Sequence, residues 1–124
     1  ALRLAVEQRE RGNEAYARRL LAEIHGERGD VEALTTERGY VDTLALAAEL
    51  DMRPLVARCH AGLGLWLQRA ERRDEAQDHL DMAVAMFRGM AMRFWVDKLE
   101  SDRREVVLNR GKETEARLLH EASI

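Results

Sequence analysis

Histidine and cysteine are the residue types in this chain that could hold a metal ion. Cys59 and His60 are adjacent, so on a helix they point to different faces, and no second cysteine completes a zinc-binding spacing. The other three histidines are scattered along the chain. We therefore predict no metal site and no cofactor. One alternative stays open, a small-ligand or metal-binding helical domain that uses His25, His60 and Arg58.

Nucleophilic catalysis would need Ser, Thr or Cys beside a histidine that a third group orients. The chain has only two serines, and Ser123 lies in the last few residues. Cys59 has apolar neighbours, which indicates a buried small hydrophobic residue rather than a reactive thiol. The 23 acidic residues show no pair in an apolar setting. The run Gly62-Leu63-Gly64 lacks the strand and the third glycine of a phosphate-binding loop. We predict that the chain is not an enzyme.

Composition places the chain among folded proteins of one domain. It has 124 residues, of which 46% are hydrophobic and 35% charged. The net charge of -3, with acidic and basic residues interleaved, argues against binding to nucleic acid or to an anionic membrane. No apolar run approaches the ~18 residues of a membrane span, and no signal peptide is visible. We expect a cytoplasmic location, and the start in helical sequence suggests a piece of a longer protein.

One short phrase occurs three times, about forty residues apart. A shift of 40 places Met52 and Arg53 on Met92 and Arg93. A shift of 42 relates the first two copies, and it places Leu2, Leu4, Ala5, Glu7, Arg11, Ala15, Leu21 and Ala22 on Leu44, Leu46, Ala47, Glu49, Arg53, Ala57, Leu63 and Gly64. A repeat of this length in helical sequence is typical of a solenoid of stacked helices.

Helix formers dominate the chain, and strand signals are absent. We predict an all-α fold of about six helices. They lie near 1–11 (ended by Gly12), 14–27, 31–50, from Pro54, from Asp74, and 92–109; residues 111–124 form a polar tail or a short extra helix. The second of these carries Ala17, Leu20, Leu21 and Ile24 as one apolar stripe. Short loops force neighbouring helices to be antiparallel, which gives stacked helical hairpins.

The second copy carries a family resemblance. Large residues at Leu63, Leu67 and Leu80 alternate with small ones at Gly64, Ala76 and Ala83, and this pattern resembles the tetratricopeptide repeat. The small residues let the two helices of a hairpin approach closely. The resemblance implies a right-handed α-solenoid over residues 1–110, with repeats at about 14–50 and 54–90 and half-repeats at 1–11 and 92–109.

A narrower resemblance covers the run from Leu50 to Gly64 and the closing phrase Met92-Arg93-Phe94-Trp95. These segments are similar to the C-terminal repeat region of large bacterial signalling proteins, which join a cyclase or transcriptional-regulator domain to an ATPase module and such repeats. Nothing of a cyclase or ATPase lies within this sequence. The resemblance implies a role in protein interaction or regulation.

In tetratricopeptide repeats the first helix of each pair lines a concave face, and counting from Ala22 and Gly64 gives the residues that face outward. They are Tyr16, Arg19 and Glu23, then Arg58, Ala61, Leu65, Gln68 and Arg69, then Lys98 and Ser101. Leu65 lies opposite the main apolar stripe, between Arg58 and Arg69, and could anchor a peptide. The alternative for Leu65 is a contact to a neighbouring repeat or to the tail.

The favoured function is therefore a non-catalytic module that binds a protein or peptide, or other domains of its parent chain. A second hypothesis is self-association as a homodimer, because a repeat array that is cut open exposes an apolar face. The third is the small-ligand or metal-binding domain described above.

Overall fold

The computed structural model describes residues 2–28 and 33–122, which form five α-helices and no strand. The helices are α1 (Leu2–Arg28), α2 (Ala33–Glu49), α3 (Arg53–Arg69), α4 (Arg73–Gly89) and α5 (Arg93–Ala122). The all-α prediction is confirmed. The predicted repeats 14–50 and 54–90 correspond to the pairs α1–α2 and α3–α4, while residues 29–32 lie outside the described part of the chain.

Five helices rather than six form because the predicted break at Gly12 is wrong. Helix α1 continues through Gly12, and α5 continues past its predicted end at residue 109, through Gly111, to Ala122. A glycine inside a helix costs only about 1 kcal/mol relative to alanine, and the helical turns on both sides outweigh that cost. The half-repeat predicted at 1–11 is thus the first part of α1. Residues 111–122 of the predicted tail continue α5, and residues 123–124 are outside the described chain.

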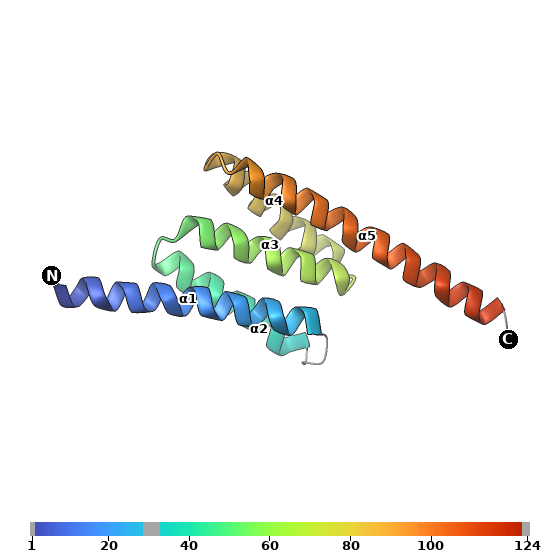
Figure 1. Cartoon of the computed structure of the whole chain (residues 1–124), viewed down its shortest axis with the longest axis horizontal. Helices are drawn as coiled ribbons and strands as arrows, with labels where there is room; N and C mark the ends of the chain where they lie inside the picture. The colour runs from blue at the N-terminus through green and yellow to red at the C-terminus, as the bar shows by residue number, and fades with distance from the viewer. Residues whose placement is uncertain (1, 29–32, 123–124) are drawn as a thin grey trace.

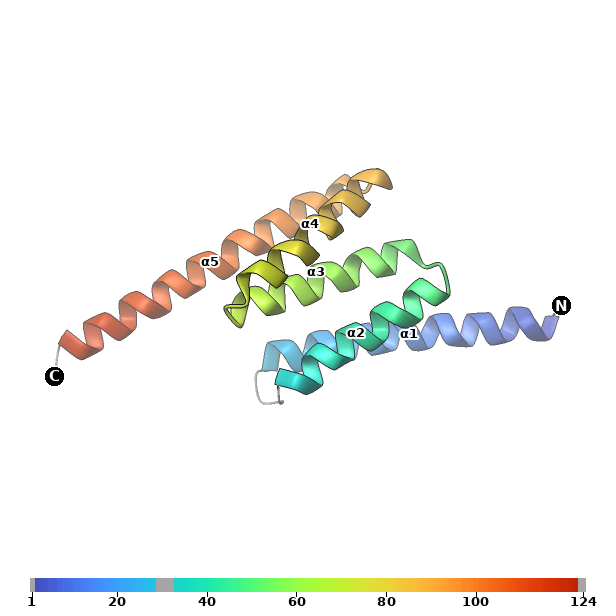
Figure 2. The same cartoon turned by 180° about the vertical axis from the view of Figure 1, so that it is seen from behind.

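The helices pack in two layers. Helices α1, α3 and α5 form one layer, in which α3 contacts both of the others, and Figure 1 looks onto it. Helices α2 and α4 form the second layer, which faces the viewer in Figure 2. Each helix also contacts the next one along the chain. The start of α1 and the end of α5 extend beyond this body in opposite directions (Figure 1).

The three described turns between helices share one geometry. Asp51, Glu71 and Ala91 each have a positive φ, between 55° and 65°. In each turn the next residue donates its N–H to the carbonyl five positions back, as in Met52 to Ala47 (2.9 Å) and Met92 to Phe87 (2.8 Å). This pairing is the Schellman motif, which ends a helix by satisfying its last carbonyl groups. The second and third copies of the repeated phrase thus end in equivalent turns, whereas the first copy lies inside α1.

The left-handed conformation of Ala91 yields a prediction of stability. Because a side chain disfavours that conformation while glycine tolerates it, Ala91→Gly is expected to raise the free energy of unfolding by about 1 kcal/mol. Urea unfolding followed by circular dichroism measures this gain. The matched control is Ala85→Gly, an exposed site inside α4, which is expected to lose about 1 kcal/mol. Losses in both variants would contradict the prediction.

The core repeats with the same period as the turns. Four buried residues on α2 have four buried counterparts on α4, at a shift of 40; the pairs are Thr36 and Ala76, Tyr40 and Leu80, Thr43 and Ala83, and Ala47 and Phe87. The two threonines stand where the repeat family usually has alanine. The Thr43 hydroxyl donates to the Gly39 carbonyl at 2.7 Å, so its burial leaves no unpaired donor.

Helix α1 keeps its apolar stripe largely exposed. Leu20, Leu21 and Ile24 are 51%, 53% and 40% exposed, whereas Ala15 and Ala22 on the same helix are buried. Leu63, the counterpart of Leu21 on α3, is buried. The difference arises because α3 packs on the preceding helix α2, and no described helix packs on the corresponding side of α1. Helix α1 thus exposes an apolar face whose counterpart on α3 is buried against a neighbouring helix.

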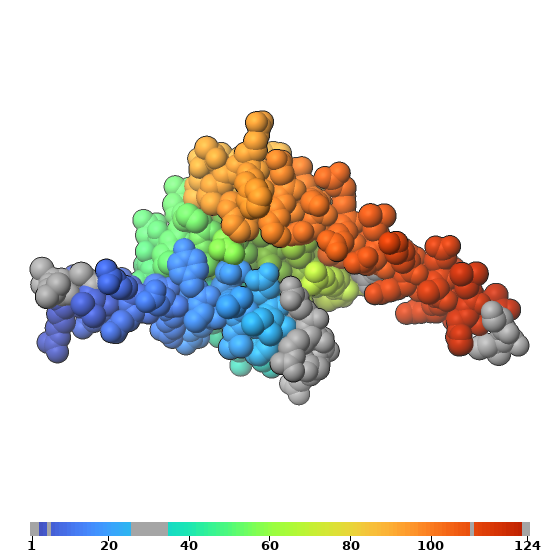
Figure 3. Space-filling model, viewed as in Figure 1, coloured from blue at the N-terminus to red at the C-terminus, as the bar shows by residue number. Residues whose placement is uncertain are grey.

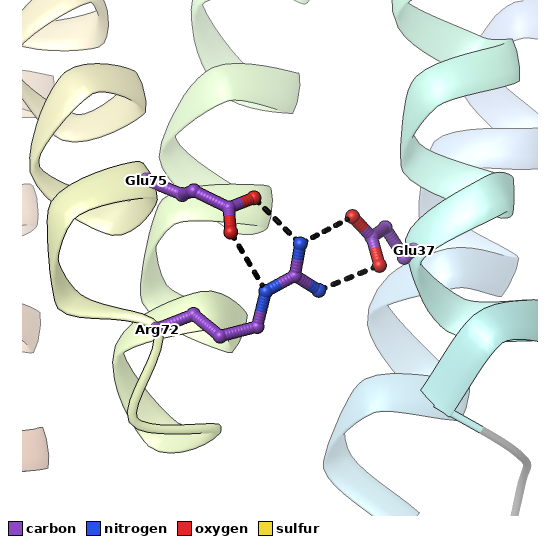
Figure 4. A network of polar contacts seen from close by, with 3 residues as sticks. All are labelled: Glu37, Arg72 and Glu75. Carbon is purple, nitrogen blue, oxygen red and sulfur yellow. Dashed lines mark hydrogen bonds and ion pairs between the residues drawn. The ribbon is translucent and has the colours of Figure 1, made fainter.

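Arg72, at the turn before α4, joins the two hairpins on the side of α2 and α4. Its guanidinium donates to both carboxylate oxygens of Glu37 on α2, at 2.7 and 3.0 Å, and also to Glu75 on α4 (Figure 4). The hydrogen bonds from Arg72 hold the pKa of Glu37 below its usual value. Such a bidentate pair fixes geometry as well as charge, and it connects α2 to the following hairpin.

Candidate functional site

A groove runs between α1, α3 and α5. It consists of two adjoining pockets of about 140 and 280 Å³ that share six lining residues. In Figure 3, α3 (green) is seen between α1 (blue) and α5 (orange) on this face. The residues of the groove are Arg19, Glu23, Tyr40, Arg58, Ala61, Gly62, Leu65, Trp66, Arg69, Phe87, Trp95, Lys98, Leu99, Asp102, Glu105, Val106 and Asn109.

Most of the residues predicted to line a concave face lie in this groove. Six of the ten line the smaller pocket, namely Arg19, Glu23, Arg58, Ala61, Leu65 and Lys98, and Arg69 lines the larger one. Tyr16 is exposed but lies near Arg58. Gln68 lines a different pocket, beside α4 and α5, and Ser101 is exposed on α5 outside both pockets. The structure thus places Gln68 and Ser101 outside the groove.

The floor of the groove is apolar and contains residues that the groove prediction did not include. Tyr40, Phe87 and Leu99 are buried, and Trp95 is partly buried beside them. Tyr40 reaches the floor because Gly62 has no side chain; a Cβ there would lie 2.7 Å from a Tyr40 ring carbon. A glycine in the middle of a helix was the available sign of this close approach. Leu65, for which exposure and a contact to a neighbouring part of the chain were both left open, packs partly buried against the same cluster.

The charged side chains around the floor are mostly paired. Arg19 donates to Glu23 at 2.8 Å, and Lys98 pairs with Asp102 at 3.0 Å. The guanidinium of Arg58 instead lies over the ring of Trp95, 4.5 Å from its centre. The Arg19 side chain is only 14% exposed, and its Nε is buried with no hydrogen-bond partner in the structure. Two arginines from different helices therefore converge on one small pocket.

Burial shifts the titration of several groups near the groove. It lowers the pKa of Arg58, with a further contribution from Arg19, although a guanidinium remains charged at neutral pH. Burial also raises the pKa of the Tyr40 hydroxyl, which stays protonated. Cys59 is buried, and its pKa is raised to about 11 by desolvation. A thiol in this state is a poor nucleophile, in agreement with its interpretation as a small core residue.

The histidines pair in a way that the sequence did not indicate. The Nδ1 atoms of His60 on α3 and His79 on α4 lie 3.0 Å apart, and the rings are stacked with centres 5.2 Å apart. One Nδ1–H must donate to the other ring nitrogen at this distance. The ring partner of His60 is therefore His79 and not His25. Among the described residues, no group of three or more His, Cys, Asp or Glu side chains could hold a metal ion.

This histidine pair predicts a dependence of stability on pH. Burial, and then His79, lower the pKa of His60 below its ordinary value near 6.5. His60 thus binds a proton more readily in the unfolded chain than in the folded one. Above about pH 6.5 the histidine is neutral in both states and the free energy of unfolding is unaffected, whereas below this pH the free energy of unfolding falls as the pH decreases. We expect the urea midpoint to decrease from pH 7 to pH 5.

A comparison of two glutamine variants tests the source of this pH dependence. His60→Gln is expected to flatten the decrease in the urea midpoint, because the titrating group is gone. The control is His120→Gln, an exposed site on α5, which should keep the decrease. A midpoint that falls equally in His60→Gln would show that other groups cause it.

Comparison with known proteins gives no match. No family model, curated protein or solved structure matches this chain. Among the described helices, none is both long and apolar enough to cross a membrane.

Proposed function

We propose that this chain is a non-catalytic helical-repeat module that binds a segment of a protein in the groove between α1, α3 and α5. The segment belongs to another protein or to another part of the parent chain. The observation that carries this proposal is the composition of the groove, in which an apolar floor with three aromatic rings and Leu99 is surrounded by charged side chains. Apolar centres with polar rims are the usual form of protein-binding surfaces.

The sequence repeat supports a finer class for the module. A period of about forty residues and three equivalent turns are typical of a solenoid of stacked helical hairpins, and the small residues Gly64, Ala76 and Ala83 support the tetratricopeptide-like, right-handed form. The resemblance of the Leu50–Gly64 run supports a place in the cytoplasmic part of a bacterial signalling protein. There the groove would take part in regulation by holding a partner segment.

Selection of peptides on the intact chain tests the groove. We expect a random peptide library to yield binders, which are then resynthesised with both ends capped. Leu65→Glu, inside the groove, should weaken their binding by tenfold or more, about 1.4 kcal/mol. Leu21→Glu, on the exposed face of α1, is the matched control and should leave binding unchanged. Failure to select any binder, or equal binding to both variants, would reject the proposal.

The open face of α1 favours self-association as a second candidate function. Leu20, Leu21 and Ile24 form an exposed apolar stripe whose counterpart on α3 packs within the fold. Two copies could bury these stripes on each other about a two-fold axis. Light scattering at high concentration is expected to show a dimer that Leu21→Glu dissociates and Leu118→Glu, at an exposed site near the end of α5, does not. A monomer at every concentration would reject this candidate.

A further inference from the structure

Charge balance in the smaller pocket of the groove leaves one cation without an anion. Its lining includes three cationic side chains, Arg19, Arg58 and Lys98, and two carboxylates, Glu23 and Asp102. Each carboxylate is already paired, Glu23 with Arg19 and Asp102 with Lys98. Arg58 is the remaining charge, and within the described chain its side chain makes no hydrogen bond or ion pair.

The guanidinium of Arg58 is positioned by Trp95. Its central carbon lies over the Trp95 ring, 4.5 Å from the ring centre, and this cation–π contact favours that position of the side chain. Ala61 and Leu65, on the same helix, line the same pocket. A partly buried guanidinium held in this way keeps several N–H donors for a ligand, and less side-chain entropy is lost when they bind.

We propose that Arg58 is the anchor for one carboxylate side chain, from an Asp or Glu in the bound protein segment, with an apolar neighbour of that residue packed on Leu65. One negative charge neutralises the pocket, whereas a dianion or the two carboxylates of an acidic chain terminus would leave excess negative charge. The planar guanidinium matches a carboxylate with two parallel hydrogen bonds. This anchor rests on the proposed function of the groove and names the chemistry of its ligand.

The experiment uses the capped peptides selected on the intact chain, so that no terminal carboxylate is present. We expect an Asp or Glu next to an apolar residue to recur among them. Replacing that acid by Asn or Gln in the peptide should weaken binding to the unmodified protein about tenfold or more, which is the range of a hydrogen-bonded charge pair. Because this comparison changes only the peptide, a misfolded protein variant cannot account for the loss of binding.

A double-mutant cycle then assigns the effect to Arg58. Arg58→Gln should weaken the binding of the acidic peptide by about tenfold and leave the binding of its amide analogue almost unchanged. The control is Arg18→Gln, which removes an exposed, ion-paired cation of α1 outside the groove and should change binding less than threefold. Fluorescence anisotropy of labelled peptides measures both. Circular dichroism confirms that each variant is folded.

Three results would overturn the anchor, and they separate it from the proposed function. Binding that is lost in Leu65→Glu but is indifferent to the peptide acid would keep the groove and reject the anchor. Equal losses in Arg58→Gln and Arg18→Gln would show a general attraction of charges rather than one site. The absence of any selected binder would reject both proposals.

Discussion

Replacing Phe87 by Ala is expected to lower the free energy of unfolding by about 3–5 kcal/mol, the range measured for buried aromatic residues. Phe87 is 1% exposed and lies between α4 and α5, where its ring stacks on that of Trp95 with centres 6.1 Å apart. Its removal would leave a cavity under the groove and deprive α5 of a main contact. Urea unfolding of the purified chain at neutral pH measures the loss.

The chain supplies a matched control for this deletion. Phe94 is 70% exposed, although its ring meets the edge of Trp95 with centres 5.5 Å apart. Phe94→Ala should therefore cost less than about 1 kcal/mol. Because both variants lose the same atoms, the difference between them isolates burial. Equal losses would mean that Phe87 is not enclosed as the structure shows.

Gly64→Ala is the second large effect, and we expect it to destabilise by about 2–3 kcal/mol. A Cβ at this position would lie 2.6 Å from Cγ and 2.7 Å from Cδ2 of Leu80, and 3.2 Å from the Ala76 carbonyl oxygen. Leu80 is 1% exposed, and the carbonyl belongs to the backbone of α4. The variant must therefore separate α3 from α4. Its unfolding midpoint is the measurement.

The same substitution at Gly111 should have the opposite sign. No atom lies within 4 Å of a Cβ built there, and the site is in the interior of α5. Gly111→Ala is expected to raise the free energy of unfolding by up to about 1 kcal/mol, which is the difference in helix propensity between the two residues. A stabilised Gly64→Ala variant would show that the close contact between α3 and α4 is not required.

The sequence predicted the close contact between α3 and α4 well, because packing there follows from residue size. Gly64 and Ala76 were identified as small residues that let the helices approach, and both are buried at the contact with Leu80. The ends of α1 and α5 were predicted less well. Gly12 was interpreted as a helix stop, and the last helix was expected to end near residue 109, but a glycine ends a helix only when the backbone there turns left-handed. In this chain Asp51, Glu71 and Ala91 adopt that conformation instead.

The sequence likewise predicted one part of the candidate site and missed another. Helical spacing placed Arg19, Arg58 and Leu65 on one side, since that depends only on the period of a helix. It could not show which charges would pair, because the pairing depends on distances between helices. For the same reason the contact of His60 with His79, nineteen positions apart, was not predicted.

The equivalence of the turns has a consequence for how such a chain can change in length. Residues 50–52 and 90–92 have the same hydrogen bonds, and each turn is followed by arginine after methionine. Excision of residues 53–92 would join Met52 to Arg93, which leaves the dipeptide at the junction unaltered. Helix α2 would then meet α5 through a turn already suited to it. Loss or duplication of one forty-residue block thus creates no new junction sequence.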